Sequence, residues 1–557
     1  MHLKLTHFRG VNGLLNYFLH TMRSSLFYFF ALCSFLGFAQ SFSIDDEQII
    51  FHQSRRDSLR SMMPKNSVAV VFANPIRNRS NDVDFVYHQD PNFYYLTGWK
   101  EPHAVLVLYS STQIDENGAY NEKLFVQERN ARMEMWNGKR LGVDGAKKMG
   151  FDRVALRNEF IQSPLDFSTF EEVLIFDFEN DERDLDNDPY DLYQLKKTFK
   201  QSIGFPLDFN RTKYSIQQAI RSVTNENYVE LKRQINRQIN RDSTLLEDEL
   251  IRAFVESESL DVPTDLKIKS AFALRNYFFD IEKLERYLGT LREEKTSFEL
   301  KKLIRAIEIS AIGQVEVMKA LNPEMSEREV QGIHEYVFKK YGAAYEGYPS
   351  IVGAGNNACV LHYIENNEAP TSNDLILMDL GAEYQGYTAD VTRTLPVNGK
   401  FSEEQRLLYE IVYNAQEAGI SIAKKGTRLG QITRATQQVV AAGLVELGII
   451  ENEKDFGRYY PHGAAHHIGL DVHDLNSYGP LRPNAIITVE PGIYIPDGSP
   501  CDPKWWGIGI RIEDDILITE DTPINLSEKA PRKWQEIEKM MRETSPLDQF
   551  KLPGLSQ

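Results

Sequence analysis

The chain has 557 residues, more than one hydrophobic core normally organises, so we expect three or four domain-sized units or two large ones. Hydrophobic residues make up 42% and charged residues 26%, which excludes collagen, a polytopic membrane protein and a wholly disordered chain. The formal net charge of −17 argues against nucleic acid and against lipid headgroups as partners. Three cysteines without a CxxC pair indicate neither a disulfide framework nor a zinc ribbon.

The first element in chain order is typical of an export signal. Arg23 precedes an apolar run over residues 26–38, which the small residue Ala39 follows. The run is shorter than the roughly 20 residues that span a bilayer, but it suits the apolar region of a signal peptide. We assign residues 1–39 to a signal peptide, with 1–21 as an extra leader if translation starts at Met22. We therefore expect an exported protein, periplasmic or secreted; a buried helix or a membrane anchor is the alternative.

The next two regions differ in texture. Short β-rich runs at 67–73, 103–109 and 172–178 alternate with polar turns, which predicts an α/β domain over residues 45–178. Residues 179–290 begin with an acidic loop and continue as heavily charged segments with helical spacing. We interpret them as a helical extension or linker without chemistry of its own.

The last region, residues 291–545, holds the polar residues of interest. It begins with an amphipathic helix at 297–321, and Ser326 with Glu329 has the spacing of a capping box at the start of a second helix. Histidines gather further on, and four of the five lie within residues 461–474, where two glycines favour a loop or strand edge over a helix. The five histidines are His362, His462, His466, His467 and His473.

Acidic residues inside apolar runs give the second signal. Asp379 ends one run, and Asp390 opens the next after a turn at 385–386, so a hairpin would bring both carboxylates to one end of a sheet. Glu490 and Glu513 each stand inside a further apolar strand. A carboxylate in such surroundings costs several kcal/mol unless it is paired or bound to metal. Any one of these acids could be explained by a buried ion pair or by a strand end that faces solvent. Four of them beside a histidine cluster are not explained in this way.

Four carboxylates with one or two imidazoles describe a particular kind of site. Oxygen-rich donor sets favour manganese, magnesium or cobalt, whereas structural zinc prefers thiolate and histidine. Two ions about 3.5–4 Å apart, bridged by carboxylates, would neutralise the four charges and turn a shared water into hydroxide near neutral pH. The residues therefore predict hydrolysis assisted by a dinuclear metal centre.

In order and context these residues resemble the pita-bread metallopeptidases, and within them the Xaa-Pro aminopeptidases (aminopeptidase P). The resemblance spans nearly the whole mature chain, including an N-terminal portion at 79–108 and 128–146. It rests on the motifs LMDLGAEYQGYTAD, ADVTRT, HGAAHHIGLDVHD, TVEPGIY and GIRIEDD. It implies a creatinase-like α/β N-terminal domain and an α+β pita-bread catalytic domain, in which a curved antiparallel sheet cradles two divalent ions, manganese before others.

The same resemblance implies roles for the metal ligands. Asp379 binds one ion, Asp390 and Glu513 bridge both, and His466 and Glu490 bind the other. Glu490 also carries the proton of the bridging hydroxide that attacks the scissile carbonyl. The implied activity removes the first residue from peptides whose second residue is proline.

Further roles follow for residues around the ligands. His473 stabilises the tetrahedral intermediate, and His362 lies near the scissile peptide. His462 contacts the proline ring, and Arg511 helps to hold the substrate. Trp136 matches a tryptophan that reaches a neighbouring subunit's site in some members, which implies a homodimer or homotetramer. His467 matches no role, and we treat it as structural.

Two departures and several alternatives remain. The stretch at 179–290 is longer than usual in this family, which affects the expected assembly, and the loop from His473 to Glu490 is short, which affects the preferred peptide length. Prolidase, acting on Xaa-Pro dipeptides, shares the ligands. A metal-free creatinase-like enzyme and an inert exported binding protein conflict with the intact ligand set, and methionine aminopeptidase lacks so long an N-terminal domain.

Overall fold

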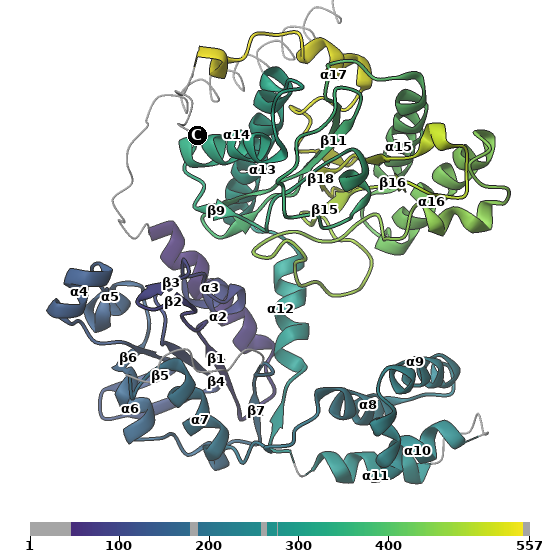
Figure 1. The fold of residues 1–557 in the computed structure, drawn as a ribbon. Helices are drawn as coiled ribbons and strands as arrows, with labels where there is room; N and C mark the ends of the chain where they lie inside the picture. Colours follow the sequence, from purple (N-terminus) through teal and green to yellow (C-terminus); the bar gives the residue numbers. More distant parts are fainter. Residues whose placement is uncertain (1–45, 179–187, 258–263, 276, 550–557) are drawn as a thin grey trace, which may run out of the picture. The chain divides into compact units, whose positions relative to one another are not determined.

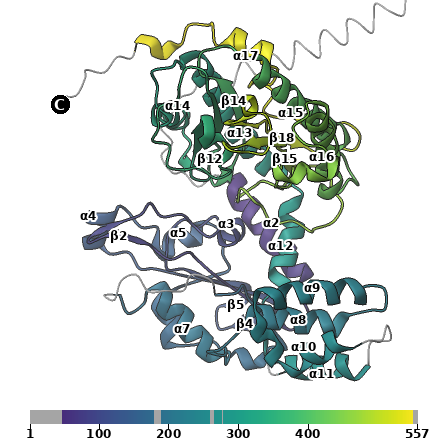
Figure 2. The same cartoon turned by 45° about the vertical axis from the view of Figure 1, so that its right-hand side comes forward.

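The computed structural model describes residues 46–178, 188–257, 264–275 and 277–549 (Figures 1 and 2). The predicted signal peptide over residues 1–39 and most of the predicted acidic loop lie outside the described residues. Within the described part of the chain, no helix is long and apolar enough to cross a bilayer.

The N-terminal domain is built on a mixed sheet with strand order β6-β5-β4-β1-β7-β8. Its strands are β1 (Ser67–Phe72), β4 (Val105–Asp115), β5 (Gly118–Val126), β6 (Arg153–Leu156), β7 (Glu172–Leu174) and β8 (Phe279–Asp280). β4 pairs antiparallel with β1 and β5, whereas β1 with β7, β7 with β8 and β5 with β6 are parallel pairs. The three predicted strands are thus β1, β4 and β7, and β1 is buried over Ser67–Val71 because both faces of the sheet are covered at its centre.

Helices and one small hairpin complete this domain. They are α2 (Asp46–Met62), the hairpin of β2 (Asn78–Ser80) and β3 (Val83–Asp84), α3 (Pro91–Thr97), α4 (Ala131–Asn137), α5 (Gly142–Lys148), α6 (Arg157–Gln162) and α7 (Leu192–Ser202). Phe160 of α6 and Phe199 of α7 pack on Phe72 with ring centroids 6.3 and 5.4 Å away. The same core takes in Phe279. The N-terminal core therefore draws on residues on both sides of the predicted boundary at 178.

The charged stretch that follows forms helices with a core of its own. They are α8 (Arg211–Ser222), α9 (Tyr228–Arg241), α10 (Glu249–Glu256) and α11 (Thr264–Leu274). Ile220, Ile235, Ile251 and Phe254 are almost fully buried against one another, as the helical spacing of apolar residues predicts. One further helix, α12 (Lys283–Glu293), leads into the C-terminal domain.

The C-terminal domain consists of short antiparallel strands, two pairs of helices and one short further helix near the end of the described chain. The strands are β9 (Tyr345–Glu346), β10 (Ile351–Ala354), β11 (Leu375–Asp379), β12 (Ala382–Tyr384), β13 (Tyr387–Thr388), β14 (Thr392–Pro396), β15 (Ile486–Val489), β16 (Gly492–Ile495), β17 (Ile508–Arg511), β18 (Asp514–Leu517) and β19 (Ile524–Asn525). The helices are α13 (Ser297–Ala320), α14 (Glu327–Lys340), α15 (Glu403–Ile422), α16 (Leu429–Glu446) and α17 (Trp534–Met540). The predicted helix at 297–321 is α13, and Ser326 with Glu329 forms the predicted capping box of α14.

Each helix pair inserts one buried glutamine into the strands. In both views, α13 and α14 lie on one side of the strands and α15 and α16 on the other (Figures 1 and 2). Gln314 of α13 donates to the carbonyls of Met378 and Val391, and Gln416 of α15 donates to the carbonyl of Val489. Because these carbonyls belong to residues beside the predicted ligands, the helices fix the backbone of the site.

The strands change direction at two of the predicted ligands, which corrects the sequence prediction. We placed Glu490 and Glu513 inside continuous strands, but Glu490 lies in the break between β15 and β16 and Glu513 in the break between β17 and β18. Pro491 has no N–H for a ladder, so the strand is interrupted there. Each break lets the chain pass from one short sheet to another, because β15 pairs with β18 and β16 pairs with β17.

Candidate metal centre

A tight hairpin brings Asp379 and Asp390 together, as the sequence predicts. β11 pairs with β14 so that Asp379 lies opposite Thr392, and β12 and β13 fold back at Gln385 and Gly386. Both turn residues have positive φ, 53° and 90°, the geometry of a two-residue hairpin turn. The two carboxylates therefore meet at one end of the strands.

The other ligands come from the second half of the domain. Residues 464–468 run beside β15: His467 pairs with Ile487, and the amide of Glu490 donates to the carbonyl of Ala464 at 2.9 Å. The loop prediction for 461–474 is thereby confirmed, with one edge-strand contact. This pairing sets His466 opposite Thr488, two residues before Glu490, and His466 Nε2 lies 3.6 Å from Glu490 Oε1 and 3.5 Å from Asp390 Oδ2.

The five predicted ligands face one cavity of about 630 Å³. Asp390, His466 and Glu513 each offer one ligand atom, and among the described residues these atoms lie within 4.8 Å of one another. His362, His462, His473 and Arg511 line the same cavity. Trp136 does not; it lies on α4 in the N-terminal domain with 79% of its surface exposed.

Burial and mutual repulsion shape the electrostatics of the carboxylates. Burial, then the nearby Asp379, raises the pKa of Asp390 well above its ordinary value, and burial, then Asp390, does the same for Glu513. Burial also raises the pKa of Glu490 to about 7, against the opposing effect of His466. The protein side chains by themselves leave this cluster short of positive charge.

Asp379 differs from the other carboxylates because a guanidinium group pairs with it directly. Burial would raise its pKa, but Arg511, whose guanidinium donates to Asp379 Oδ2 at 2.6 Å, lowers the pKa below the ordinary value. Arg511 also donates to the hydroxyl of Tyr494 at 3.0 Å, and that hydroxyl lies 2.9 Å from His462 Nε2. Arg511 and Tyr494 thus link the carboxylate of Asp379 to the imidazole of His462.

Sequence reasoning missed Tyr348. Its hydroxyl lies 2.5 Å from Oδ1 of Asp379 and 2.5 Å from Oδ1 of Asp390, and it lines the cavity. Tyr348 stands in a short polar turn without periodicity, so no pattern in the sequence marks it. Thr392, within a motif that we did identify, is a second omission: its hydroxyl donates to Glu513 Oε2 at 2.6 Å.

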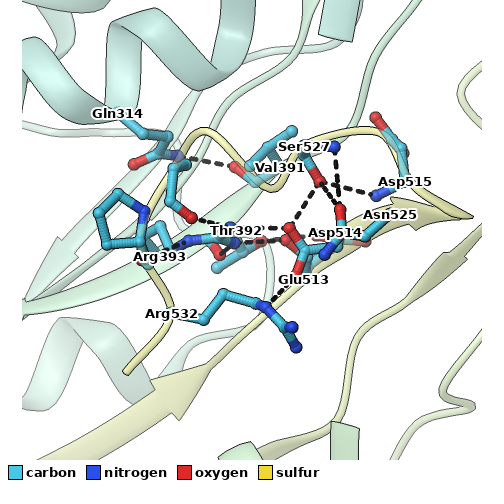
Figure 3. Close-up of polar contacts among 12 residues, drawn as sticks. Gln314, Val391, Thr392, Arg393, Glu513, Asp514, Asp515, Asn525, Ser527 and Arg532 are labelled. Atoms are coloured by element: carbon cyan, nitrogen blue, oxygen red, sulfur yellow. Dashed lines mark hydrogen bonds and ion pairs between the residues drawn. The ribbon is translucent and has the colours of Figure 1, made fainter. Parts of the chain in front are cut away.

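A buried polar network behind the ligands holds their backbone (Figure 3). The guanidinium of Arg393 donates to the carbonyls of Thr392 and Glu513 at 2.8 and 2.6 Å and to Asp514 at 2.7 Å. The amide of Asp390 donates to Asp515 Oδ2 at 3.1 Å. Two ligands are therefore fixed through the chain on which they stand.

The donor set fits divalent metal ions. Carboxylate oxygens from four acids converge with one imidazole, and the raised pKa values of Asp390 and Glu513 show that these groups need positive charge to stay ionised. Asp379, Asp390, His466, Glu490 and Glu513 are the residues that would hold the ions. His362, His462 and His473 stand around them in the same cavity.

Comparison with known proteins gives consistent matches over both domains. The family model described as metallopeptidase family M24 matches residues 301–520, and that of the aminopeptidase P N-terminal domain matches residues 52–163. Xaa-Pro aminopeptidase of Escherichia coli K12 is 32% identical over 503 residues, which cover 88% of this chain and 97% of that protein.

Solved structures of aminopeptidase P are similar to this chain over nearly its whole length. Escherichia coli aminopeptidase P with the inhibitor Pro-Leu is 30% identical, with a TM-score of 0.69 over 90% of this chain and 99% of that one. A zinc-substituted form of aminopeptidase P from the same organism, in complex with product, is 29% identical, with a TM-score of 0.67 over 90% and 99%.

Proposed function

Since this chain belongs to metallopeptidase family M24, with the pita-bread catalytic fold behind an aminopeptidase P N-terminal domain, we propose that it removes the first residue from peptides whose second residue is proline. It is a metal-dependent aminopeptidase, as its Xaa-Pro aminopeptidase relatives are. The observation that carries the substrate proposal is the cavity in which all five ligands meet His362, His462 and His473.

The protein's own groups divide the work around the scissile bond. When bound, the divalent ions supply Lewis-acid polarisation of the carbonyl and lower the pKa of water. Glu490, whose pKa is raised to about 7, is able to take up a proton and to return it to the leaving imide nitrogen of proline. His473 faces the cavity and would donate to the oxyanion as it develops.

Recognition of proline falls to His462 and its neighbours. Burial, then Arg511, lowers the pKa of His462 to about 4, so its imidazole is neutral at physiological pH. A neutral ring beside the hydroxyl of Tyr494 suits an apolar pyrrolidine better than an imidazolium does. The nitrogen of proline also has no N–H, so a peptidase cannot recognise it by a backbone hydrogen bond. A site that contacts the pyrrolidine ring is therefore selective for proline.

The metal that we propose is manganese, two ions per chain. Four carboxylates and a single imidazole form an oxygen-rich set, which favours manganese over zinc. Protein purified without added metal from a manganese-supplemented host would carry about two equivalents of manganese per chain by elemental analysis. A site filled mainly by zinc or magnesium under these conditions would overturn the assignment.

Activity on matched peptides tests the substrate proposal. Mature protein beginning at Gln40 would be loaded with manganese and given Xaa-Pro-Xaa tripeptides beside Xaa-Pro dipeptides, with Asp379→Asn as the control. Release of the first residue from tripeptides, lost in the variant, supports the proposal. Cleavage restricted to dipeptides would move the assignment to prolidase, and cleavage of neither with any of several divalent ions would leave an inert scaffold.

We further propose that the protein is exported and that it works as a homodimer or homotetramer. The apolar segment before residue 40 supports export, and the exposed ring of Trp136 supports a contact with a partner's site. Edman sequencing of protein from outside the cytoplasm should begin near Gln40. Light scattering should give a multiple of the chain mass, and Trp136→Ala should raise KM for tripeptides; a monomer with unchanged KM would refute the assembly.

A further inference from the structure

A buried ion cluster lies directly behind the loop that carries His473. Asp474, the next residue, has a side chain only 1% exposed. One of its oxygens accepts from Arg292, near the end of α12, and the other accepts from Lys295 Nζ at 2.7 Å. The side chains of Arg292 and Lys295 are each 1% exposed as well.

The same short segment fastens the rest of the loop. Arg292 also donates to Asp471 at 2.8 Å, and the amide of Ser477 donates to Glu293 at 2.9 Å. A Cβ atom on Gly289 would stand 2.5 Å from the carbonyl oxygen of Asn476, so α12 contacts the loop with no room to spare. The loop over residues 471–477 is thus held at several points by one helix end.

Stability alone is a weak reason for such a cluster. Burying two cations and a carboxylate costs several kcal/mol per ion, and well-packed apolar residues of similar size often stabilise a fold as well or better. Burial opposes ionisation of Asp474, but Arg292 and then Lys295 lower its pKa below the ordinary value, so the carboxylate stays charged. The two ion pairs fix the orientation of the Asp474 carboxylate as well as its position.

The backbone of His473 depends on this fixed point. Its side chain faces the cavity, with its ring centroid 4.4 Å from that of His466, so the neighbouring residue sets where the ring can reach. The amide of Asp474 donates to the carbonyl of His467 at 2.8 Å, which closes the loop. A Cβ atom on Gly469 would stand 2.1 Å from Asp474 Oδ2, so the loop folds tightly around this carboxylate.

We propose that Arg292 and Lys295 are positioning residues for His473 and that they act through the carboxylate of Asp474. The inference rests on the proposed function, because it assigns His473 a task in the reaction. It links a segment outside the catalytic motifs to the imidazole that faces the developing oxyanion. A displacement of that imidazole by about 1 Å is enough to lower the rate by on the order of 100-fold.

A double-mutant cycle tests the coupling. The variants are Asp474→Asn, His473→Ala and their combination, with kcat and KM measured on an Xaa-Pro-Xaa tripeptide. Asp474→Asn should lower kcat by about 10- to 100-fold with KM changed by less than about 3-fold. In the His473→Ala background the same substitution should change kcat by less than about 3-fold. An equal loss in both backgrounds, or a change in KM alone, would overturn the proposal.

A conservative variant and a surface control complete the design. Arg292→Lys keeps the charge but not the two-pronged contact, so it should lose less activity than Arg292→Met. Lys301→Met removes an ammonium that is 65% exposed and pairs with Glu47, and it should leave kcat unchanged. Loss of activity in Lys301→Met equal to that in Arg292→Met would mean a general effect of charge.

Hydrogen exchange gives a readout independent of catalysis. In the full chain, the amides of residues 471–477 should exchange faster in Arg292→Lys than in the unaltered protein, while those of α15 stay unchanged. Unchanged exchange in the loop would overturn the fastening. If the unaltered protein cleaves no peptide, the proposed function fails, whereas the exchange result still decides whether α12 holds this loop.

Discussion

Replacing Arg393 by methionine should destabilise the catalytic domain more than any surface change of charge. Arg393 is fully buried and pairs with Asp514, which is also fully buried, at 2.7 Å. Its guanidinium further donates to the backbone carbonyls of four residues, of which Thr392 and Glu513 are labelled in Figure 3. These residues are Thr392, Glu513, Ala530 and Pro531.

The expected magnitude follows from what remains after the substitution. Removing one partner of a buried ion pair costs about 3–5 kcal/mol. Asp514 keeps Arg532 at 3.2 Å and Gln416 at 3.0 Å, so we expect a cost near the lower end, about 3 kcal/mol. For a domain of this size, 1 kcal/mol shifts Tm by roughly 2–4 °C, which gives a fall of about 6–12 °C.

Calorimetry in excess chelator measures this loss without a contribution from metal binding. Lys529→Met is the matched control, because that ammonium is 62% exposed in its pair with Glu308 and should matter by less than about 1 kcal/mol. Adding Asp514→Leu to Arg393→Met should restore part of the loss, because the unpaired buried charge is gone. An Arg393→Met transition within 2–4 °C of the Lys529→Met transition would refute the reasoning.

Three further predictions concern charge and space. Asp390→Asn should lower the metal content measured by elemental analysis yet raise Tm in chelator, because it removes one of the crowded buried charges; a fall in Tm would contradict this. The hydrogen bond with Glu383 is the largest of the effects that raise the pKa of His88. This pair therefore stabilises the fold fully below pH 6.5, the ordinary pKa of histidine, and the stabilisation is lost as the pH rises through the raised pKa. Because 55% of the His88 side chain is exposed, His88→Gln should lower the free energy of unfolding by under about 1 kcal/mol at pH 5.5 and leave it unchanged at pH 9. Equal shifts in the unfolding midpoint at the two pH values would contradict this prediction. Gly469→Ala should lower kcat with Tm reduced by several degrees, because the added carbon would overlap Asp474, and unchanged kinetics would show that the loop has room.

The sequence predicted the parts of the site that depend on local pattern. A run of apolar residues ending in an acid, then a turn at Gln385 and Gly386, is enough to bring Asp379 and Asp390 together, because hairpin geometry is local. The capping box at Ser326 was predictable for the same reason. The break at Glu490 was readable in principle, since a proline follows it.

Contacts between distant segments could not be predicted in this way. Tyr348 reaches Asp379 and Asp390 only because β10 and β11 pair beyond it, and its own neighbourhood has no periodicity. Arg292 and Asp474 are separated by most of the catalytic domain, and each stands near a charged residue that is more exposed, Glu294 and Asp471 respectively. Which charges become buried partners depends on packing, and a single sequence does not contain that information.

The three consecutive acids at residues 513–515 show where the limit lies. Asp514 and Asp515 belong to β18, in which neighbouring side chains point to opposite faces, and Glu513 stands in the break just before this strand. Glu513 faces the cavity, Asp515 accepts from the amide of Asp390, and Asp514 pairs with Arg393. Alternation therefore separates Asp514 from Asp515, but it does not mark Glu513 as the ligand. The chemical distinction is in the partner, because Asp514 pairs with a guanidinium, whereas Glu513 accepts from the hydroxyl of Thr392 at 2.6 Å and burial beside Asp390 raises its pKa.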